Sequence, residues 1–430
     1  MKARWLTLLT VLLCCSACGA PSLRHKQQVN KLLAQGEYAS AGQSLESAKG
    51  KQYSRRDSLL YYLDTGAVLH AAGEPAASDE KLALAQERIE ELFTQSLSAQ
   101  AGRFLINDLT VPYYPAAFER SLTYYYRAMN FLDRNDVPGA LVEANKAVYY
   151  LDGLRGSKRS GWRDDPFVQY FSSLVFESAG KRDDARIARA RAVQAYGTSY
   201  DPFYVAPVQG WGEVIIVHEN GVSPLKKSNT FQVNWDSVLL WAQAHQEGEE
   251  GLSPQVQNAI VAGLLGKSVT ISYPTLEEQP YTITASEAVT AQGQVYPTRL
   301  AGNVAQAAEA DLQEKELATL MRSAARAATK RVAAVQAKHL AQQSSGDESM
   351  GDLAELVFSF LGAVTEKADT RQWFTLPAQF RLVRFYVPPG PQDILLRFKD
   401  GFGNIVGEHI FDKVPVRPGG RVYLHYRTAQ

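Results

Sequence analysis

The sequence predicts an α+β protein built from several domains, and three observations predict it. Bulky and small residues recur at helical spacing up to about residue 200. Helix-breaking Pro and Gly residues then appear, and apolar runs with strand character follow them. The chain ends in short strand-like runs separated by Gly- and Pro-containing turns. With 430 residues, the chain is long enough for about two to four domains.

The clearest helical pattern lies between residues 124 and 147. Its first half carries Tyr124, Ala128 and Phe131 on one face, and Asn135-Asp136 then interrupts the run. Its second half carries small residues, which are Ala140, Ala144 and Ala147. A bulky face followed by a turn and a small-residue face is typical of two closely packed antiparallel helices. The pattern resembles a tetratricopeptide (TPR) repeat, a helix-turn-helix unit of about 34 residues.

Three further stretches repeat this scheme, so we expect a TPR-like solenoid over residues 28–200. The turns are expected at Gly36, Gly73, Asn135 and Gly180, which are 37, 62 and 45 residues apart. A regular array would keep a spacing near 34 residues, so the solenoid is expected to be degenerate and interrupted. The additional length includes an expected helix over residues 83–97. An ordinary helical bundle without repeats remains the alternative.

The first helix of each pair is expected to face the concave side of the array, where TPR-like proteins bind partners. By this pattern the candidate partner-binding residues are His70, Tyr125, Met129, Tyr170, Leu174 and Glu177. The alternative is that the tyrosines fill the core between helices, which is common for aromatic residues in helical repeats.

A central α+β domain is expected over residues 205–300. The run Glu213–His218 has strand character, and Asn220-Gly221 is a strong hairpin-turn signal that would return the chain near residue 231. Ser253-Pro254 is expected to open a helix that ends at Gly266. Further strands are expected at residues 268–273 and 281–284.

Residues 303–368 are expected to hold a long helix over 303–343, a linker, and an amphipathic helix over 353–364. Residues 374–430 are expected to form a small antiparallel β-sandwich-like module packed on the preceding helix. Its strands are predicted at residues 379–387, 393–399, 405–411 and 421–427.

The N-terminus has the features of a lipoprotein signal peptide. Lys2 and Arg4 precede the apolar run Trp5–Leu13, which is too short to span a bilayer. Ser16-Ala17-Cys18 resembles a bacterial lipobox, which predicts a signal peptide over residues 1–17 and lipidation of Cys18. Residues 18–27 would then form the lipidated Cys and a tether. An ordinary secretory signal is the alternative.

The composition disfavours several kinds of chemistry. All three cysteines lie in the signal segment, so the mature chain has no disulfide or thiol site. Lys+Arg and Asp+Glu both number 45, which gives no indication of nucleic-acid binding. The seven histidines show no HExxH motif and no i, i+4 pair. We therefore expect no catalytic residues, no metal site and no cofactor, although a spatial pair of carboxylates stays open.

Several short motifs resemble an uncharacterised family of Gram-negative outer-membrane lipoproteins with TPR-like N-terminal halves. They are residues 128–132 with 139–144, 165–170, 212–216 with Asn220-Gly221, 368–373, and 387–390. Gly19 after the acylated Cys is similar to the signal of lipoproteins sorted to the outer membrane. The resemblance implies no catalytic residues and an association with lipoproteins that activate penicillin-binding proteins.

The expected function is therefore that of a lipid-anchored periplasmic adaptor on the outer membrane, which binds other cell-envelope proteins. The lipid would be its only membrane contact. Two alternatives remain: a structural subunit of an envelope machine, such as a secretion or motility ring, and an enzyme acting on envelope glycan.

Overall fold

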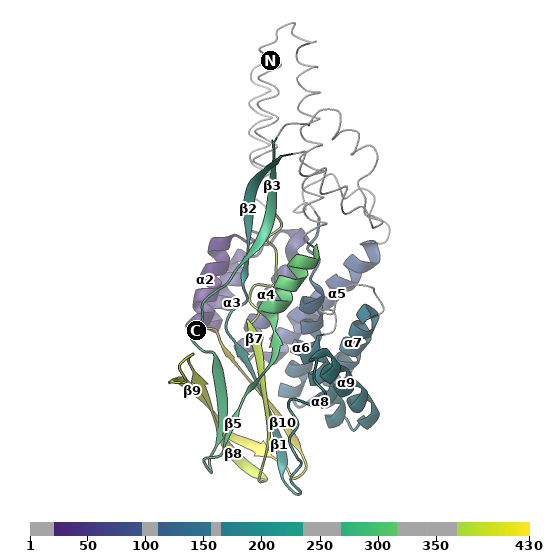
Figure 1. Cartoon of the computed structure of the whole chain (residues 1–430), viewed down its shortest axis with the longest axis vertical. Coiled ribbons are helices and arrows are strands. Elements are labelled where there is room, and N and C mark those ends of the chain that lie inside the picture. The colour runs from purple at the N-terminus through teal and green to yellow at the C-terminus, as the bar shows by residue number, and fades with distance from the viewer. Residues whose placement is uncertain (1–20, 97–110, 156–164, 235–267, 316–341, 343–367) are drawn as a thin grey trace.

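The computed structural model describes residues 21–96, 111–155, 165–234, 268–315, 342 and 368–430. The helices before residue 200 form four consecutive pairs that stack side by side (Figure 1). They are α2 (Leu23–Ala34) with α3 (Tyr38–Ala48), α4 (Ser58–Ala71) with α5 (Pro75–Ser96), α6 (Ala117–Asp133) with α7 (Val137–Arg155), and α8 (Pro166–Ser178) with α9 (Arg182–Ala195). A short 3-10 helix, η2 (Arg55–Asp57), precedes α4. The helical N-terminal part is thus confirmed.

The same turn closes every helix pair. Gly36, Gly73, Asn135 and Gly180 all have positive φ, between 57° and 75°. In the second pair, Gly73 N–H donates to His70 O, and the following N–H donates to Leu69 O. This left-handed cap satisfies the last carbonyls of the first helix and reverses the chain. All four turns fall at the positions predicted from the sequence.

Small residues let the paired helices approach closely. Several alanines on the second helices are at most 5% exposed, including the expected Ala140, Ala144 and Ala147 and also Ala41, Ala48, Ala85, Ala185 and Ala192. At Gly66 on α4, a Cβ atom would lie 2.7 Å from the Leu82 side chain of α5. The helix expected over residues 83–97 is the second half of the continuous helix α5.

The prediction of a tether over residues 18–27 is wrong for residues 21–27, the part that the structure describes. Ser22 caps α2 by accepting the His25 N–H, so the helix begins at Leu23. Lys26 is only 1% exposed, and its Nζ donates a 2.6 Å hydrogen bond to Thr370 O. Because Lys26 is anchored in the interior, these residues belong to the first helix pair.

The strands in the described residues form two four-stranded sheets and a separate two-stranded ribbon. The first sheet has the order β10 (Arg421–Thr428), β1 (Gly212–Asn220), β7 (Gln379–Val387), β6 (Arg299–Asn303). The second has the order β5 (Val295–Pro297), β4 (Ala285–Thr290), β8 (Gly390–Lys399), β9 (Ile405–Val416). The ribbon pairs β2 (Leu225–Asn234) with β3 (Ser268–Glu277) and extends away from the sheets (Figure 1).

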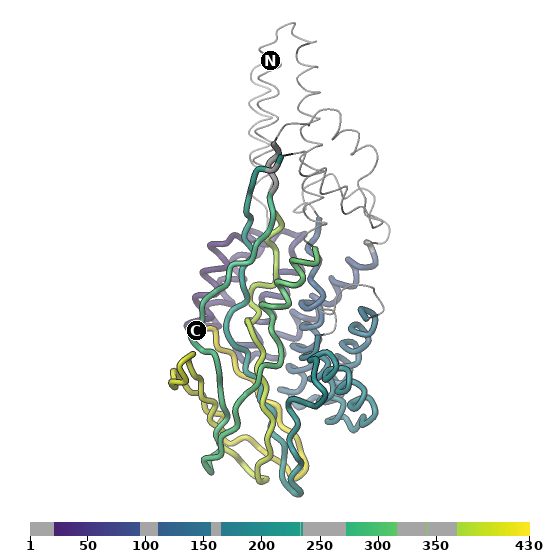
Figure 2. The backbone as a smooth tube through the Cα atoms, viewed as in Figure 1, coloured from purple at the N-terminus to yellow at the C-terminus, as the bar shows by residue number. Residues whose placement is uncertain are grey.

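These sheets join segments that the sequence assigned to separate domains. β1 pairs in parallel with β10 and antiparallel with β7, so the strands before residue 300 and after residue 374 form shared sheets (Figure 2). The division into 205–300 and 374–430 domains is therefore wrong, and so is a self-contained C-terminal meander. The prediction of a hairpin at Asn220-Gly221 is also wrong, because β2 pairs with β3 and not with β1.

Strand β1 lies between two apolar layers, which explains why all nine of its residues are buried. Ile215 and Val217 pack in the core shared with the helices, while Val214 and Ile216 pack in the core between the two sheets. The molecule therefore has three layers in the order helices, first sheet, second sheet. The first sheet lies against the first helices of the pairs, because β10 contacts α6 and β6 contacts α8.

Several predicted elements lie outside the described residues: the signal peptide with Cys18, the helix expected from residue 254, and the amphipathic helix over 353–364. Of the long helix expected over 303–343, the structure describes residues 303–315 and 342, of which 304–315 and 342 are helical. Among the described residues, no helix has both the length and the apolar character needed to cross a membrane.

Candidate functional site

Five of the six residues predicted to line an open groove lie in the interior of the protein. His70, Tyr125, Met129, Tyr170 and Leu174 are each at most 1% exposed. The first sheet covers the helix face that carries them, so the position expected for a partner is filled by the chain's own strands. The prediction of an accessible groove at these five residues is wrong, and the alternative that the tyrosines are core residues is right.

Tyr125 shows how completely this face is filled. Its ring lies 4.8 Å from that of Phe167, 4.9 Å from that of Phe171 and 5.1 Å from that of Phe380 on β7. Its hydroxyl donates a 3.1 Å hydrogen bond to Glu219 Oε1 on β1. Both the apolar and the polar part of the side chain therefore bind the sheet.

Beyond the sheet, the irregular segment 368–376 fills the inner face of the first helix pairs. Arg371 Nη1 lies 3.0 Å from Asp57 Oδ1, and Trp373 N–H donates to Glu119 Oε1 at 2.8 Å. Thr375 Oγ1 donates to Asp64 Oδ1 at 3.1 Å. This segment includes residues 368–373, one of the motifs singled out in the sequence.

Glu177, the sixth predicted residue, is partly exposed and belongs to an ion-pair network between helices and sheet. Its carboxylate lies 2.7 Å from both Arg189 on α9 and Arg421 on β10. Arg421 lies 2.6 Å from Glu213, and Glu213 lies 2.5 Å from Arg384. Burial raises the pKa of Glu177, but its hydrogen bond to Arg189 and the arginine charges outweigh this and leave the pKa lowered.

Tyr170 and Asp201 close this network into a ring. Arg384 donates to the Tyr170 hydroxyl at 2.7 Å, and that hydroxyl donates to Asp201 at 3.2 Å. Asp201 in turn lies 3.6 Å from Arg189. Three arginines and three carboxylates balance in charge, so the ring joins α8 and α9 to the sheet without leaving a buried charge unpaired.

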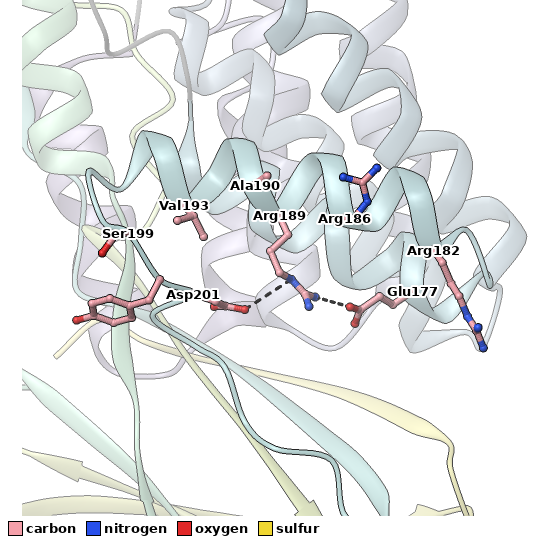
Figure 3. A pocket seen from close by; sticks show the side chains of 9 residues that line it. Glu177, Arg182, Arg186, Arg189, Ala190, Val193, Ser199 and Asp201 are labelled. Atoms are coloured by element: carbon pink, nitrogen blue, oxygen red, sulfur yellow. Dashed lines mark ion pairs between the residues drawn. The ribbon is translucent and has the colours of Figure 1, made fainter.

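The outer side of this ring borders an open pocket of about 500 Å³. Three arginines of α9 line it, namely Arg182, Arg186 and Arg189, together with residues 199–201. Figure 3 shows Arg189 reaching between Asp201 and Glu177, so its charge is already neutralised. Tyr200 beside it is 67% exposed. The pocket therefore offers an aromatic ring and arginine side chains at the accessible surface.

A second polar cluster lies where α4 and α6 meet β1 and β10. The rings of His70 and His425 stack with centroids 4.0 Å apart. His70 Nδ1 lies 2.7 Å from Asn130 Oδ1, and His70 Nε2 lies 3.3 Å from Glu219 Oε1. His425 Nε2 lies 3.1 Å from Asp133 Oδ2. Two imidazoles and two carboxylates thus meet between the helical layer and the sheet.

Glu219 is ionised despite its burial. Burial raises the pKa of its carboxyl, but the His70 charge and hydrogen bond, followed by His425 and Arg427, bring the pKa down to about 2. The Tyr125 and Tyr126 hydroxyls also donate to it. Glu219 and His218 both lie within β1, which is covered on both faces, so neither side chain is solvated.

His218 faces the second sheet. Its Nδ1 lies 2.8 Å from Ser286 Oγ and its Nε2 lies 2.7 Å from Thr428 Oγ1. Burial lowers its pKa to about 3, so this imidazole is neutral. Two hydroxyls therefore satisfy a neutral histidine in the core between the sheets.

Sequence reasoning missed the histidine cluster because no spacing signal exists for it. His425 and Asp133 are 292 positions apart and are brought together only by the docking of β10 against α6. The one hint of this cluster in the sequence was two polar residues on the first helices of two pairs, His70 and Asn130. No protein-family model, curated protein or solved structure matches the chain.

Proposed function

We propose that the protein is a lipid-anchored adaptor on the periplasmic side of the outer membrane, which binds other cell-envelope proteins. The lipobox-like Ser16-Ala17-Cys18 supports the anchor. We interpret the helix pairs as degenerate TPR-like repeats, because each is closed by the same left-handed turn and packed through small residues. The two sheets with a shared core are interpreted as a sandwich-like module.

The observation that carries this proposal is the location of the exposed apolar side chains on the helical layer. The second helices α7 and α9 expose Val142 (53%), Tyr149 (84%) and Ile187 (40%), and Tyr200 lies beside the adjoining pocket. Because the chain's own sheet covers the first-helix face, a partner would bind this outer face. Aromatic and arginine side chains of the kind found here are enriched at the centres of protein interfaces.

The resemblance to envelope lipoproteins suggests the kind of partner, including lipoproteins that activate penicillin-binding proteins. We propose binding without catalysis, without a nucleic-acid partner, and with membrane contact only through the lipid on Cys18.

The test is site-specific photo-crosslinking in intact Gram-negative cells. A photoreactive amino acid replaces Tyr149 or Tyr200, and Phe402, which is 94% exposed in the turn between β8 and β9, serves as the matched control. We expect Tyr149 and Tyr200, but not Phe402, to capture a defined envelope protein identified by mass spectrometry. Capture at Phe402 alone, or no envelope protein at either helical position, would refute the proposed surface. Ladders of the chain crosslinked to itself would favour a structural ring subunit.

A further inference from the structure

The cluster between α4, α6 and β10 has the composition of a metal site. His70, Asp133 and His425 each place one ligand atom within 4.8 Å of the others. Imidazole nitrogen and carboxylate oxygen are the protein ligands that zinc takes outside cysteine sites. We propose that these three residues bind one divalent transition-metal ion of the zinc class.

A chain of hydrogen bonds determines which nitrogen of His70 is available. Ser78 Oγ donates to Gly66 O at 2.8 Å, so it accepts the 2.8 Å hydrogen bond from Asn130 Nδ2. Asn130 Oδ1 therefore faces His70 Nδ1, which must carry the proton. The neutral ring then has its lone pair on Nε2. This atom is buried and lies 3.3 Å from Glu219 Oε1, so a metal would replace the proton that these two groups share.

The surroundings of His70 match those of metal-bound histidines. Such residues usually donate their second ring N–H to a fixed acceptor, as His70 does to Asn130, which sets the tautomer and orients the ring. Glu219 lies 3.3 Å from Nε2 and is held by the Tyr125 and Tyr126 hydroxyls. Together with Asp133 it supplies two negative charges, which balance a divalent cation.

The other two ligands lie on the accessible side of the cluster. The side chains of Asp133 and His425 are 19% and 14% exposed, so an ion has a route to His70 past them. His425 Nδ1 also lacks a hydrogen bond among the described residues. The two rings are stacked, 22° from parallel with centroids 4.0 Å apart, so one ion cannot lie in the plane of both. Binding therefore requires the His425 ring to turn out of the stack and point a nitrogen at the ion.

The ion would join two layers of the protein. His70 and Asp133 belong to the helical layer, on α4 and α6, whereas His425 belongs to β10 of the first sheet. A metal that binds only this docked arrangement stabilises it in proportion to its affinity. This assignment departs from the sequence analysis, which expected no metal site, and it is independent of the proposed adaptor function.

The test uses the purified mature chain, freed of metal with a chelator and titrated with Co²⁺ and then Zn²⁺. We expect one Co²⁺ per chain, visible absorption of a low-symmetry protein site, displacement by Zn²⁺, and a melting temperature that rises with Zn²⁺ and falls with chelator. The rim variants His425→Ala and Asp133→Asn should each lose at least tenfold in affinity. His409→Ala serves as the control, because His409 lies on β9 of the second sheet, where its ring stacks on Tyr426 of β10.

Three results would overturn the proposal. The first is a Co²⁺ spectrum identical to that of the aqueous ion. The second is equal affinity in the His425→Ala variant, and the third is an equal loss in the His409→Ala control. Any of these results would mean that the cluster binds no metal and that His70 and Glu219 form an ion pair instead. Circular dichroism of each variant establishes that it is folded, and Asp133→Asn provides a second rim variant if His425→Ala is not.

Discussion

Replacing Tyr125 with alanine tests whether the first-helix face is interior or binding surface. If the residue lined an open groove, Tyr125→Ala would leave folding nearly unchanged and weaken partner capture. In the structure the side chain is 1% exposed and touches aromatic rings from α8 and β7. We therefore expect a large loss of stability, because the variant leaves a cavity between the helical layer and the sheet.

The magnitude follows from what the alanine removes. Truncating a buried aromatic side chain costs about 3–5 kcal/mol through lost burial and the cavity that remains. Tyr125→Phe keeps the ring and removes only the hydroxyl that donates to Glu219. A hydrogen bond to a charged group contributes about 1.5–3 kcal/mol. Glu219 retains Tyr126 and His70, so we expect the lower end of that range.

Chemical denaturation followed by circular dichroism and tryptophan fluorescence measures these changes. The matched control is Tyr149→Ala, which removes the same atoms from a side chain that is 84% exposed. It should change the free energy of unfolding by less than about 0.5 kcal/mol. If Tyr125→Ala and Tyr149→Ala have equal stability, the sheet does not cover the helices as described and the groove is open.

Three further predictions concern other parts of the chain. His218 has a folded pKa of about 3 against 6.5 for an ordinary histidine, so only the unfolded chain takes up a proton between these values. Stability is therefore retained above pH 6.5 and lost as the pH falls, by about 2 kcal/mol at pH 5, and denaturation of His218→Asn should lack this contribution. Ala140→Leu should cost about 1–3 kcal/mol in a thermal or chemical melt, because Ala140 is fully buried, whereas Val142→Leu at the exposed face should cost little. Cys18→Ala should move the protein out of the membrane fraction, and a variant that stays with the outer membrane would show that the lipid does not localise it.

Local features were predictable from the sequence, because they depend on neighbouring residues. The four helix turns were placed correctly, since a Gly or Asn that ends a helical pattern readily takes the left-handed conformation. Strand β7 was predicted with its observed bounds from a run of strand-forming residues ending at Pro388. The burial of the second-helix alanines followed from their spacing.

Only the tertiary structure decided which surfaces these elements share. Nothing near β1 in the sequence indicates that Glu213 pairs with Arg421, or that β1 lies between two apolar layers. An apolar first-helix face has the same sequence pattern whether it awaits a partner or packs on the chain's own sheet. For the same reason His70 and His425 were unrelated in the sequence: their contact depends on long-range strand docking, which residue type and local spacing do not encode.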